Sequence, residues 1–422
     1  MPDSIDFLYS LERLGMKFGL ENIAALSAEL GHPERTFKSL VVAGTNGKGS
    51  VTVMTETALR AAGLRAARYT SPHLVRLEER FVIDGDEVTT DKLRDALETV
   101  QAAVTSLVQR GAMDTLPTFF EVATAAAFEL FRRAAVEIAV LEVGLGGRLD
   151  ATNVVTPVAT AITSIDFDHQ AQLGNTIASI AFEKAGIVKR GVPLVCGPVP
   201  EAAERVIREI CEAQQSRLID ATEVVSIVPS AEGDAIDVRT PQRSLDHVTF
   251  ALRGRHQRDN ASVAVALLDE LTRQGVAIPD RAVREGLEKV RWPARLERFV
   301  VRGIDVLLDA AHNPAGARAL ASHLKEIGWS RITLLFGAMR DKDVAGMLEP
   351  VGPRCEAIVC TTAPSARALP AEDLARVARR FAPIVEAIDD PAAALDTALA
   401  RQRPVVAAGS IFLIGPLRDI LR

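Results

Sequence analysis

The sequence predicts a two-domain α/β protein in which each domain is built on a doubly wound, mainly parallel sheet. Short apolar runs alternate with segments of helical periodicity along most of the 422 residues, and this alternation is typical of parallel strands covered by helices on both faces. The alternation breaks at residues 291–295 and then resumes. The chain is also too long for one ordinary hydrophobic core. We therefore expect a first domain over residues 1–295 and a second, smaller, Rossmann-like domain over residues 296–422.

The expected strands are short apolar runs that end in glycine or polar residues. In the first domain they cover residues 40–43, 66–70, 138–143, 158–163 and 192–195. The expected helices cover much of 1–38 with a break near 31–33, and then 51–62, 119–133, 177–188, 260–271 and 280–290. Residues 215–253 carry turn residues and no long helical pattern, which predicts a small β or irregular insertion. The second domain has expected strands at 304–308, 332–336, 357–361 and 405–408, with helices between them.

Composition and charge exclude several classes of function. The formal net charge of −6 gives no overall reason to expect nucleic acid as a partner. No run approaches 18 apolar residues, and the first residues lack the basic and apolar regions of a signal peptide. None of the four cysteines is spaced as C-x-x-C, which indicates reduced thiols and no zinc site. We expect a cytoplasmic monomer with neither a nucleic-acid nor a membrane partner.

A glycine-rich segment between an expected strand and an expected helix predicts a phosphate-binding loop. It runs Gly44-Thr45-Asn46-Gly47-Lys48-Gly49-Ser50. Free backbone N–H groups and the positive end of the helix point toward an anion at such a turn. Lys48 adds a full positive charge, and Ser50 offers a hydroxyl near a magnesium ion. The alternative is a tight glycine turn with a solvated lysine.

The loop departs from the common pattern G-x-x-x-x-G-K-[ST] at two places. Val42 stands where that pattern needs glycine, and Gly49 follows the lysine where it needs serine or threonine. The loop by itself therefore predicts only that a nucleotide binds.

A second set of polar residues follows other expected strands. Glu142 lies at the carboxyl end of the run at 138–143, which is followed by glycines. Ligands of open α/β sheets bind at the carboxyl ends of the strands, and a carboxylate there suits magnesium. A glutamate satisfied by neighbouring N–H groups is the alternative. Ser71 and His169 also follow expected strands, although a lone histidine is more often an ordinary surface or core residue.

These segments resemble one family of enzymes. Residues 42–50, Val-Ala-Gly-Thr-Asn-Gly-Lys-Gly-Ser, and residues 140–153 resemble the two signatures of the folylpolyglutamate synthase and dihydrofolate synthase family, which belongs to the Mur ligases. The departures from the common phosphate loop are this family's own pattern. The resemblance extends over nearly the whole chain, with weak support at 215–253. It implies a P-loop ATPase-type first domain, of the Mur ligase central type, and a glutamate ligase second domain.

The resemblance also implies the residues that handle ATP and metal. It assigns magnesium to Ser71, Glu142 and His169, with two Mg²⁺ ions in all, and leaves room for a monovalent cation such as K⁺. The residues matched to ATP contacts are Gly44, Thr45, Asn46, Gly47, Lys48, Gly49, Ser50, Asn260, Arg295 and Asp309. Because Arg295 lies at the break between the domains, we expect ATP to bind between them.

Three residues are candidates for the chemistry. Lys48 faces the phosphates, and His312 lies close to the ATP contacts. The lysine matched to Lys184 is carboxylated by carbon dioxide in the family, whereas from the residues alone Lys184 is an ordinary lysine on a helix, extended to solvent or salt-bridged.

The expected acceptor site is also carried over from the family. Its residues are Gly19, Leu20, Glu21, Thr118, Phe119, Phe120, Glu121, Asp150, Ala151 and Asn153. Aromatic rings can stack on a flat pterin. The alternative for Phe119 and Phe120 is a place in the hydrophobic core.

The function implied is ATP-dependent addition of L-glutamate to dihydropteroate, to tetrahydrofolate and its polyglutamates, or to both. The reaction would pass through an acyl phosphate and release ADP and phosphate. A monofunctional folylpolyglutamate synthase stays open, as do a P-loop NTPase without ligase activity and a non-catalytic nucleotide-binding protein. A Mur-type ligase of cell-wall precursors is disfavoured, because only 43 residues precede Gly44 and such ligases carry a further domain there.

Overall fold

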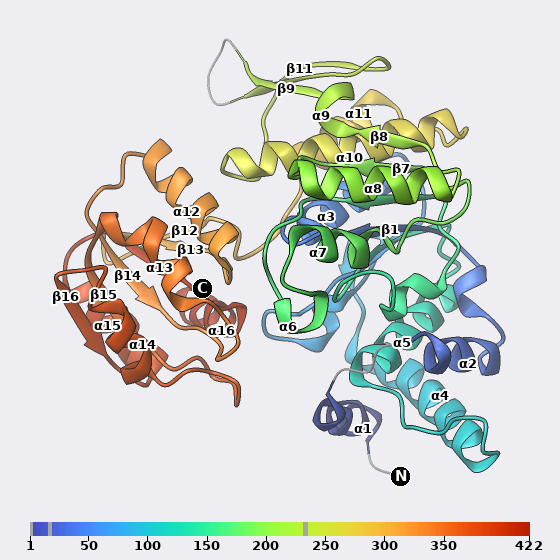
Figure 1. The fold of residues 1–422 in the computed structure, drawn as a ribbon, viewed down its shortest axis with the longest axis horizontal. Coiled ribbons are helices and arrows are strands. Elements are labelled where there is room, and N and C mark those ends of the chain that lie inside the picture. The colour runs from blue at the N-terminus through green and yellow to red at the C-terminus, as the bar shows by residue number, and fades with distance from the viewer. Residues whose placement is uncertain (1–2, 16–18, 231–234) are drawn as a thin grey trace. The chain divides into compact units, whose positions relative to one another are not determined.

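The computed structural model describes residues 3–15, 19–230 and 235–422 (Figure 1), and the chain divides into two compact units. The first unit consists of Met1–Asp166, Gln170–Ala251 and Asp259–Val290. The second consists of Phe167–His169, Leu252–Arg258 and Arg291–Arg422. The continuous part of the second unit thus begins a few residues before the expected boundary at 295/296. The unit also takes two short segments from earlier in the chain, which the sequence patterns did not indicate.

The first unit is organised around an eight-stranded sheet with the order β4-β3-β2-β5-β1-β6-β7-β8. Its strands are β1 Lys38–Ala43, β2 Ala66–Tyr69, β3 Phe81–Ile83, β4 Asp86–Glu87, β5 Ile138–Glu142, β6 Ala159–Ile162, β7 Leu194–Cys196 and β8 Leu218–Asp220. The six strands from β2 to β8 in this order pair in parallel, and β3 and β4 add an antiparallel edge. The central strands are continuous apolar runs because both faces of the sheet are covered.

Alternate residues of these strands pack on opposite faces of the sheet. Val41 and Leu141 belong to a large core cluster with Phe128 of α5. Helix α3 packs against β1, β2 and β5, and its buried residues, such as Leu59, lie outside that cluster. The helix that follows the glycine-rich loop is therefore held on the face away from α5.

The helices along residues 3–290 include two long ones that the sequence did not predict, α4 and α8. The α-helices are α1 Ser4–Ser10, α2 Glu21–Glu29, α3 Lys48–Ala61, α4 Thr90–Gln109, α5 Phe119–Arg133, α6 Gln170–Leu173, α7 Ile177–Ala185, α8 Glu201–Ala213, α9 Ala221–Val224, α10 Arg255–Arg273 and α11 Asp280–Glu288. Short 3-10 helices are η1 Leu11–Leu14, η2 Pro33–Arg35, η3 Leu77–Arg80 and η4 Ala151–Val154. None of the helices in the part of the chain that the structure describes is long and apolar enough to cross a membrane.

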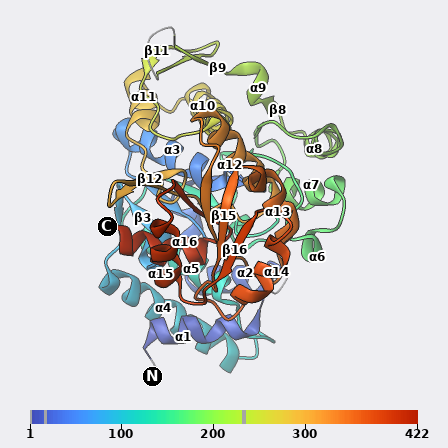
Figure 2. The same cartoon turned by 90° about the vertical axis from the view of Figure 1, so that its left-hand side faces the viewer.

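The insertion expected over 215–253 is narrower in the structure. Strands β9 Ser226–Pro229, β10 Ile236–Arg239 and β11 Ser244–Val248 form an antiparallel sheet with the order β11-β10-β9. Figures 1 and 2 both show this sheet beside α11, which contacts β11. Residues 218–220, however, form β8 and pair in parallel with β7. The start of the expected insertion thus belongs to the large sheet. The sequence did not indicate this, because an edge strand with the sequence Leu-Ile-Asp has too short an apolar pattern to be recognised.

The second unit contains a six-stranded sheet with the order β12-β13-β17-β14-β15-β16. Its strands are β12 Glu297–Val301, β13 Ile304–Leu308, β14 Ile332–Phe336, β15 Cys355–Cys360, β16 Ile384–Ala387 and β17 Val405–Ala408. All pair in parallel except β12, which is antiparallel to β13. The helices are α12 Pro314–Glu326, α13 Val344–Val351, α14 Ala371–Ala378, α15 Pro391–Ala400 and α16 Ile411–Leu421, with η5 Gly352–Arg354. The edge strands β12 and β16 are half exposed, which explains why an apolar-run criterion does not detect them.

A buried arginine ties the three-stranded sheet to the helices beside it. The Arg243 side chain is 3% exposed and forms an ion pair with Asp269 of α10. It also donates hydrogen bonds to the Ile278 carbonyl at 2.8 Å, to Thr272 Oγ1 at 2.8 Å and to Asp280 Oδ1 at 3.0 Å. One cation thus links the small sheet to α10 and to the start of α11.

We predict that Arg243→Met destabilises the protein, because it leaves the Asp269 carboxylate buried without its partner. Removing one member of a buried ion pair costs about 3–5 kcal/mol. Urea unfolding at pH 7.5 measures the change. Arg208→Met, which removes an exposed pair with Glu204, is the matched control and should leave the midpoint unchanged. A midpoint for Arg243→Met equal to that of the control would contradict the assignment.

Candidate active site

The glycine-rich loop joins the end of β1 to the start of α3, and two of its glycines are required by close neighbours. Gly44 has φ 149° and Gly47 has φ 89°. A Cβ on Gly44 would collide with the Thr163 hydroxyl, and one on Gly47 would collide with the side chain of Asn260. The structure therefore brings the predicted ATP residue Asn260, from α10, directly against the loop.

Two lysines converge on one carbonyl of this loop. Lys48 Nζ donates to the carbonyls of Gly44 and Thr45, each at 3.2 Å. Lys184 Nζ, from α7, donates to the same Gly44 oxygen at 2.9 Å across a separation of 140 residues in the chain. Lys184 is only 5% exposed. Two ammonium groups at one turn give a positive site suited to phosphate. Carboxylation of Lys184 stays a prediction.

The segment after β6 also holds the loop, and sequence reasoning missed it. Thr45 Oγ1 donates to the Asp166 carbonyl at 3.1 Å and accepts from the Asp166 N–H at 3.0 Å. The Thr45 N–H donates to the Ser164 carbonyl at 2.8 Å. The only signal in the sequence was a Thr-Ser pair at the carboxyl end of an expected strand. These contacts fix the loop to the neighbouring strand end rather than leaving it to its own turn geometry.

Two of the three predicted metal ligands are adjacent in the first unit. In the sheet Val42 of β1 is paired with Glu142 of β5, and Leu141 is paired with Tyr69 of β2. Glu142 is 5% exposed, and its Oε2 accepts a hydrogen bond from the Ser71 N–H at 3.2 Å. A carboxylate and a hydroxyl are hard oxygen donors beside the phosphate loop, and this donor set fits Mg²⁺.

The third predicted ligand, His169, is grouped with the second unit together with Asp168. Asp168 Oδ1 pairs with Lys342 Nζ at 2.6 Å, and Asp168 Oδ2 lies 3.7 Å from His312 Nε2. Burial alone would raise the pKa of Asp168, but the charges of His169, Lys342 and His312 outweigh it and hold that pKa well below its usual range. The role of His169 at the metal stays a prediction.

Asp309 stabilises the turn at residues 294–296 of the second unit. It ends β13, is 7% exposed, and accepts hydrogen bonds from the backbone N–H groups of Leu296 and Ala311, each at 2.9 Å. Leu296 and Ala294 both have positive φ, 50° and 58°. The turn between them carries Arg295, whose guanidinium lies 5.7 Å from the centre of the Trp292 ring. Asp309 thus positions Arg295, while direct contact of either with ATP stays a prediction.

His312 contacts a backbone carbonyl through one ring nitrogen and a carboxylate through the other. Burial lowers the pKa of His312, which favours the uncharged ring. Its Nδ1 lies 2.9 Å from the Ala310 carbonyl. Because a carbonyl can only accept, this contact needs a proton on Nδ1, while Nε2 lies 3.7 Å from Asp168 Oδ2.

In the expected acceptor site, Thr118 and Glu121 form a cap at the start of α5. The Thr118 N–H donates to Glu121 Oε2 at 2.8 Å, and the Glu121 N–H donates to Thr118 Oγ1 at 3.2 Å. This reciprocal pair is a capping box. Both residues are buried, so they have a structural role in addition to any contact with substrate.

The two phenylalanines of this segment are half-buried. Phe120 packs 5.9 Å from Tyr69, ring centre to ring centre, and Phe119 packs 5.8 Å from Tyr9. The Arg80 guanidinium lies 5.0 Å from the centre of the Phe119 ring. Phe119 and Phe120 are therefore partly packed against other side chains and partly exposed, and a flat ring can stack on the exposed part.

The loop after β5 packs against this segment and against the end of α7. A Cβ on Gly144 would lie 2.7 Å from the Phe120 ring. Asp150 is buried and accepts from the Leu145 N–H at 2.9 Å and the Thr152 N–H at 3.0 Å, and burial raises its pKa. Asn153 Nδ2 donates to the carbonyls of Arg148 and Gly186, each at 3.0 Å. These predicted acceptor residues therefore also shape the loop.

The remaining predicted acceptor residues lie at the start of α2 and in η4. Leu20 packs on the same core cluster as Phe119 and Phe120, and Ala151 is a buried member of it. Gly19 has φ 139°, and Glu21, the first residue of α2, is exposed. Residues 16–18 lie outside the described part of the chain.

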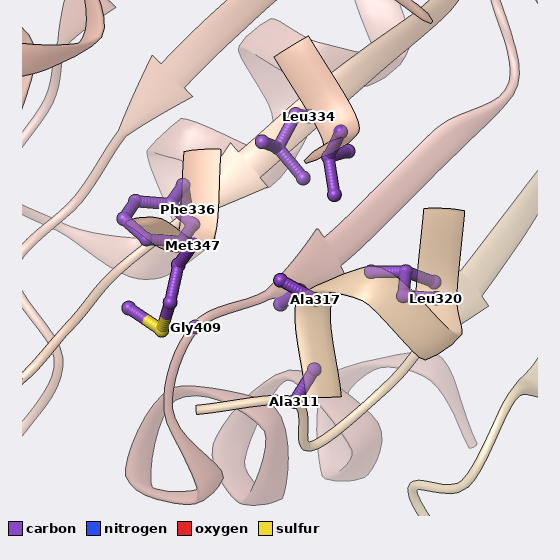
Figure 3. A pocket seen from close by; sticks show the side chains of 9 residues that line it. Ala311, Ala317, Leu320, Leu334, Phe336, Met347 and Gly409 are labelled. Atoms are coloured by element: carbon purple, nitrogen blue, oxygen red, sulfur yellow. The ribbon is translucent and has the colours of Figure 1, made fainter. Parts of the chain in front are cut away.

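A small cavity in the second unit contains none of the predicted site residues (Figure 3). Its lining consists of Ala311, Ala317, Leu320, Leu334, Phe336, Met347, Val351, Ala408 and Gly409. Figure 3 shows the side chains of Leu334, Phe336 and Met347 among those that line it. Because every side chain is apolar, this cavity is a packing gap between the sheet and its helices rather than a site for charged substrates.

Comparison with known proteins identifies the family. The Mur ligase middle domain matches residues 85–268, and the Mur ligase glutamate ligase domain matches residues 294–411. A dihydrofolate synthase/folylpolyglutamate synthase of Bacillus subtilis is 34% identical over 429 residues, which cover 100% of this chain and 99% of that protein. This chain belongs to the folylpolyglutamate synthase/dihydrofolate synthase family of Mur ligases.

Solved structures of the family confirm the predicted fold class. A Mycobacterium tuberculosis folylpolyglutamate synthase, complexed with ADP and AMPPCP, matches with a TM-score of 0.91 and 33% identity over 99% of both chains. A bifunctional folylpolyglutamate synthase/dihydrofolate synthase with Mn, AMPPNP and L-glutamate bound matches with a TM-score of 0.87 and 30% identity over 100% of this chain and 98% of that one. The chain spans about half the length of two further relatives, from Haloferax volcanii and Halobacterium salinarum.

We predict that Gly47→Ala impairs nucleotide use, because its methyl group would displace Asn260 from the loop. A displacement of this size near reacting groups can lower kcat/KM for ATP by about 10²-fold. Gly63→Ala is the matched control, since Gly63 has φ 90° and nothing within 4 Å of its Cβ position. It should lose about 1–3 kcal/mol of stability from backbone strain and keep its kinetics. Equal kinetics for the two variants would contradict the packing of Asn260 on the loop.

We also predict a pH dependence of stability from His256. Burial, followed by the charges of His323 and Arg295, lowers the pKa of His256 to about 4 in the folded protein, from 6.5. Between these values the unfolded chain binds a proton that the folded one does not, so stability is complete above pH 6.5 and falls as the pH drops toward 4. Urea unfolding at pH 7.5 and pH 5 should show a smaller loss for His256→Gln than for the wild type. An equal loss in both would rule out this histidine as a source.

Proposed function

We propose that this chain is an ATP-dependent ligase that adds L-glutamate to dihydropteroate and to reduced folates. The reaction passes through an acyl phosphate and releases ADP and phosphate. The near full-length identity to a Bacillus subtilis protein named for both activities supports the proposal. So does the solved relative that holds Mn, AMPPNP and L-glutamate, the classes of metal, nucleotide and amino acid that the reaction needs.

One observation in the structure carries the proposal. Glu142, a buried carboxylate held by the Ser71 N–H, lies on the strand beside the one that leads into the phosphate loop. A P-loop switch also holds Mg²⁺ beside its nucleotide with a carboxylate, but it needs neither His169 nor a second domain with Asp309. A metal site beside the lysine of a phosphate loop is what activation of a carboxylate requires, because the phosphoryl group and the attacking carboxylate oxygen both carry negative charge.

In this proposal each group of residues has a separate role. Lys48 neutralises the transferring phosphoryl group, and Ser71, Glu142 and His169 hold Mg²⁺. A divalent metal held there would polarise the phosphoryl oxygens as a Lewis acid. Arg295, positioned by Asp309, contacts ATP. The remaining contribution is positioning of the acyl group and the amine, which can supply about 7–11 kcal/mol.

The identity of the acceptor is the finer part of the proposal. Half-buried Phe119 and Phe120, beside the loop with Asp150, suit a flat pterin ring. We favour both synthase activities, and a monofunctional folylpolyglutamate synthase is the second candidate. Carboxylation of Lys184, a second Mg²⁺, a K⁺ site, a monomeric state and a cytoplasmic location belong to the proposal as well.

We predict that Lys48→Ala abolishes glutamate addition while the protein stays folded. Loss of one charged group from a transition state costs about 10²–10³-fold in kcat. The assay supplies ATP, Mg²⁺, L-glutamate and either dihydropteroate or tetrahydrofolate, and it identifies the product by mass. Lys289→Ala, which removes an exposed pair with Glu285, is the control and should retain full activity.

Three results would change the conclusion. Near-normal turnover in folded Lys48→Ala would remove the loop from the chemistry. A product from tetrahydrofolate alone would restrict the chain to the monofunctional alternative, and ATP hydrolysis independent of both glutamate and acceptor would favour an NTPase without ligase activity.

A further inference from the structure

Two hydroxyl groups outside the phosphate loop bind one carbonyl inside it. Thr163 Oγ1 donates to the Asn46 carbonyl oxygen at 2.6 Å, and Ser164 Oγ donates to the same oxygen at 3.0 Å. Ser164 Oγ also accepts from the Asn46 N–H at 3.1 Å. Both polar backbone groups of Asn46 are therefore held by the two residues that directly follow β6.

These contacts determine the direction of the next N–H group. In a planar trans peptide the C=O of one residue and the N–H of the following residue point in opposite directions. Because the Asn46 carbonyl points toward Thr163 and Ser164, the Gly47 N–H points away from them. Gly47 precedes the first turn of α3, where N–H groups have no partner within the helix and are the donors that bind phosphate.

The loop and the strand end fit each other at close range. The Thr163 hydroxyl occupies the place where a side chain on Gly44 would lie, and Thr163 is 2% exposed. The Thr163 N–H donates to the Ala43 carbonyl at 2.9 Å, which continues the pairing of β6 with β1. From this position the hydroxyl meets the Asn46 carbonyl at 2.6 Å, which is much closer than the Ala43 carbonyl at 3.4 Å.

We propose that Thr163 and Ser164 are positioning residues that orient the Asn46–Gly47 peptide so that the Gly47 N–H faces the nucleotide phosphates. Part of the affinity for ATP then depends on two hydroxyl groups that act only through the loop backbone. This inference rests on the proposed function, because it takes the loop to be the nucleotide site.

The test uses substitutions that remove hydroxyl groups with little change in shape. Thr163→Val and Ser164→Ala, singly and together, are compared with Thr163→Ser, which restores a hydroxyl at the same position. Thr160→Val is the matched control. Thr160 lies on β6, is fully buried, and donates to the Pro193 carbonyl at 3.3 Å, on the side of β6 away from β1. It therefore reports the general cost of losing a buried hydroxyl from this strand.

The measurement is the affinity of each full-length variant for Mg·ADP by titration calorimetry, with the melting temperature recorded beside it. If the Gly47 N–H no longer faces the phosphates, one hydrogen bond to a charged group is lost, and such a loss weakens binding by about tenfold or more. We expect that weakening in Thr163→Val and a larger one in the double variant. Thr163→Ser and Thr160→Val should bind within about twofold of wild type, well inside the tenfold that 1.4 kcal/mol represents. If the double variant does not fold, the Mg·ADP affinities of the two single variants decide whether the inference holds.

Two outcomes would overturn the inference. Folded Thr163→Val and Ser164→Ala that both bind Mg·ADP like the wild type would show that the hydroxyl groups do not orient the loop. Equal weakening in Thr160→Val would show that β6 stability alone is responsible. A wild-type protein that neither binds Mg·ADP nor forms a glutamylated product would instead refute the proposed function, so the two failures are distinguishable.

Discussion

The parallel pairing of β1 with β5 on one side and β6 on the other places the parts of the site together. β1 continues into the phosphate loop, β5 ends at Glu142, and β6 leads into Thr163 and Ser164. Parallel strands bring their carboxyl ends to one edge of a sheet, where open α/β folds bind ligands. The register is as important as the order, because a slip of one residue would turn every side chain of the slipped strand to the other face. Glu142 would then point away from Ser71.

This arrangement of strand ends buries two charged side chains, and each of them depends on a backbone group of a neighbouring segment. Lys184 and Glu142 are each 5% exposed, and a buried ion is costly unless hydrogen bonds replace its water. Lys184 binds the Gly44 carbonyl, and Glu142 accepts from the Ser71 N–H. The loop therefore supplies a partner for a lysine that comes from α7. Its conformation in turn needs glycine at positions 44 and 47, where side chains would collide with Thr163 and Asn260.

Much of the fold follows from sequence patterns where elements are buried on both sides. The strands expected at 304–308, 332–336 and 405–408 and the helix expected at 119–133 have the same bounds in the structure. The patterns fail at edges and on surfaces. β8, β12 and β16 are edge strands whose residues are partly exposed, so they lack a continuous apolar run. Helices α4 and α8 are a different case. In α4 the buried residues Leu93, Leu97, Val100 and Val104 follow the N-cap Thr89 at helical spacing, so the pattern is present in the sequence although no helix was expected there.

The residues of the candidate site also fall into those that the sequence indicated and those that it did not. Residues whose chemistry needs a particular side chain, such as Lys48 and Glu142, occur in recognisable segments, and the structure brings them to neighbouring strand ends. Thr163 and Ser164 were not recognised, because a hydroxyl bound to a backbone carbonyl leaves no pattern in the sequence and depends on pairing between segments about 120 residues apart.

Family likeness can also assign a role that is only part of what a residue does. Asp309 was matched to ATP, but both of its oxygens bind backbone N–H groups around the turn that carries Arg295. Thr118 and Glu121 were matched to substrate, and they cap α5. A carboxylate committed to backbone N–H groups fixes the geometry of its neighbours before any ligand arrives. The same residue type at the same position can therefore be required because it shapes the site, and loss of activity on its removal would not by itself show that it touches the nucleotide or the folate.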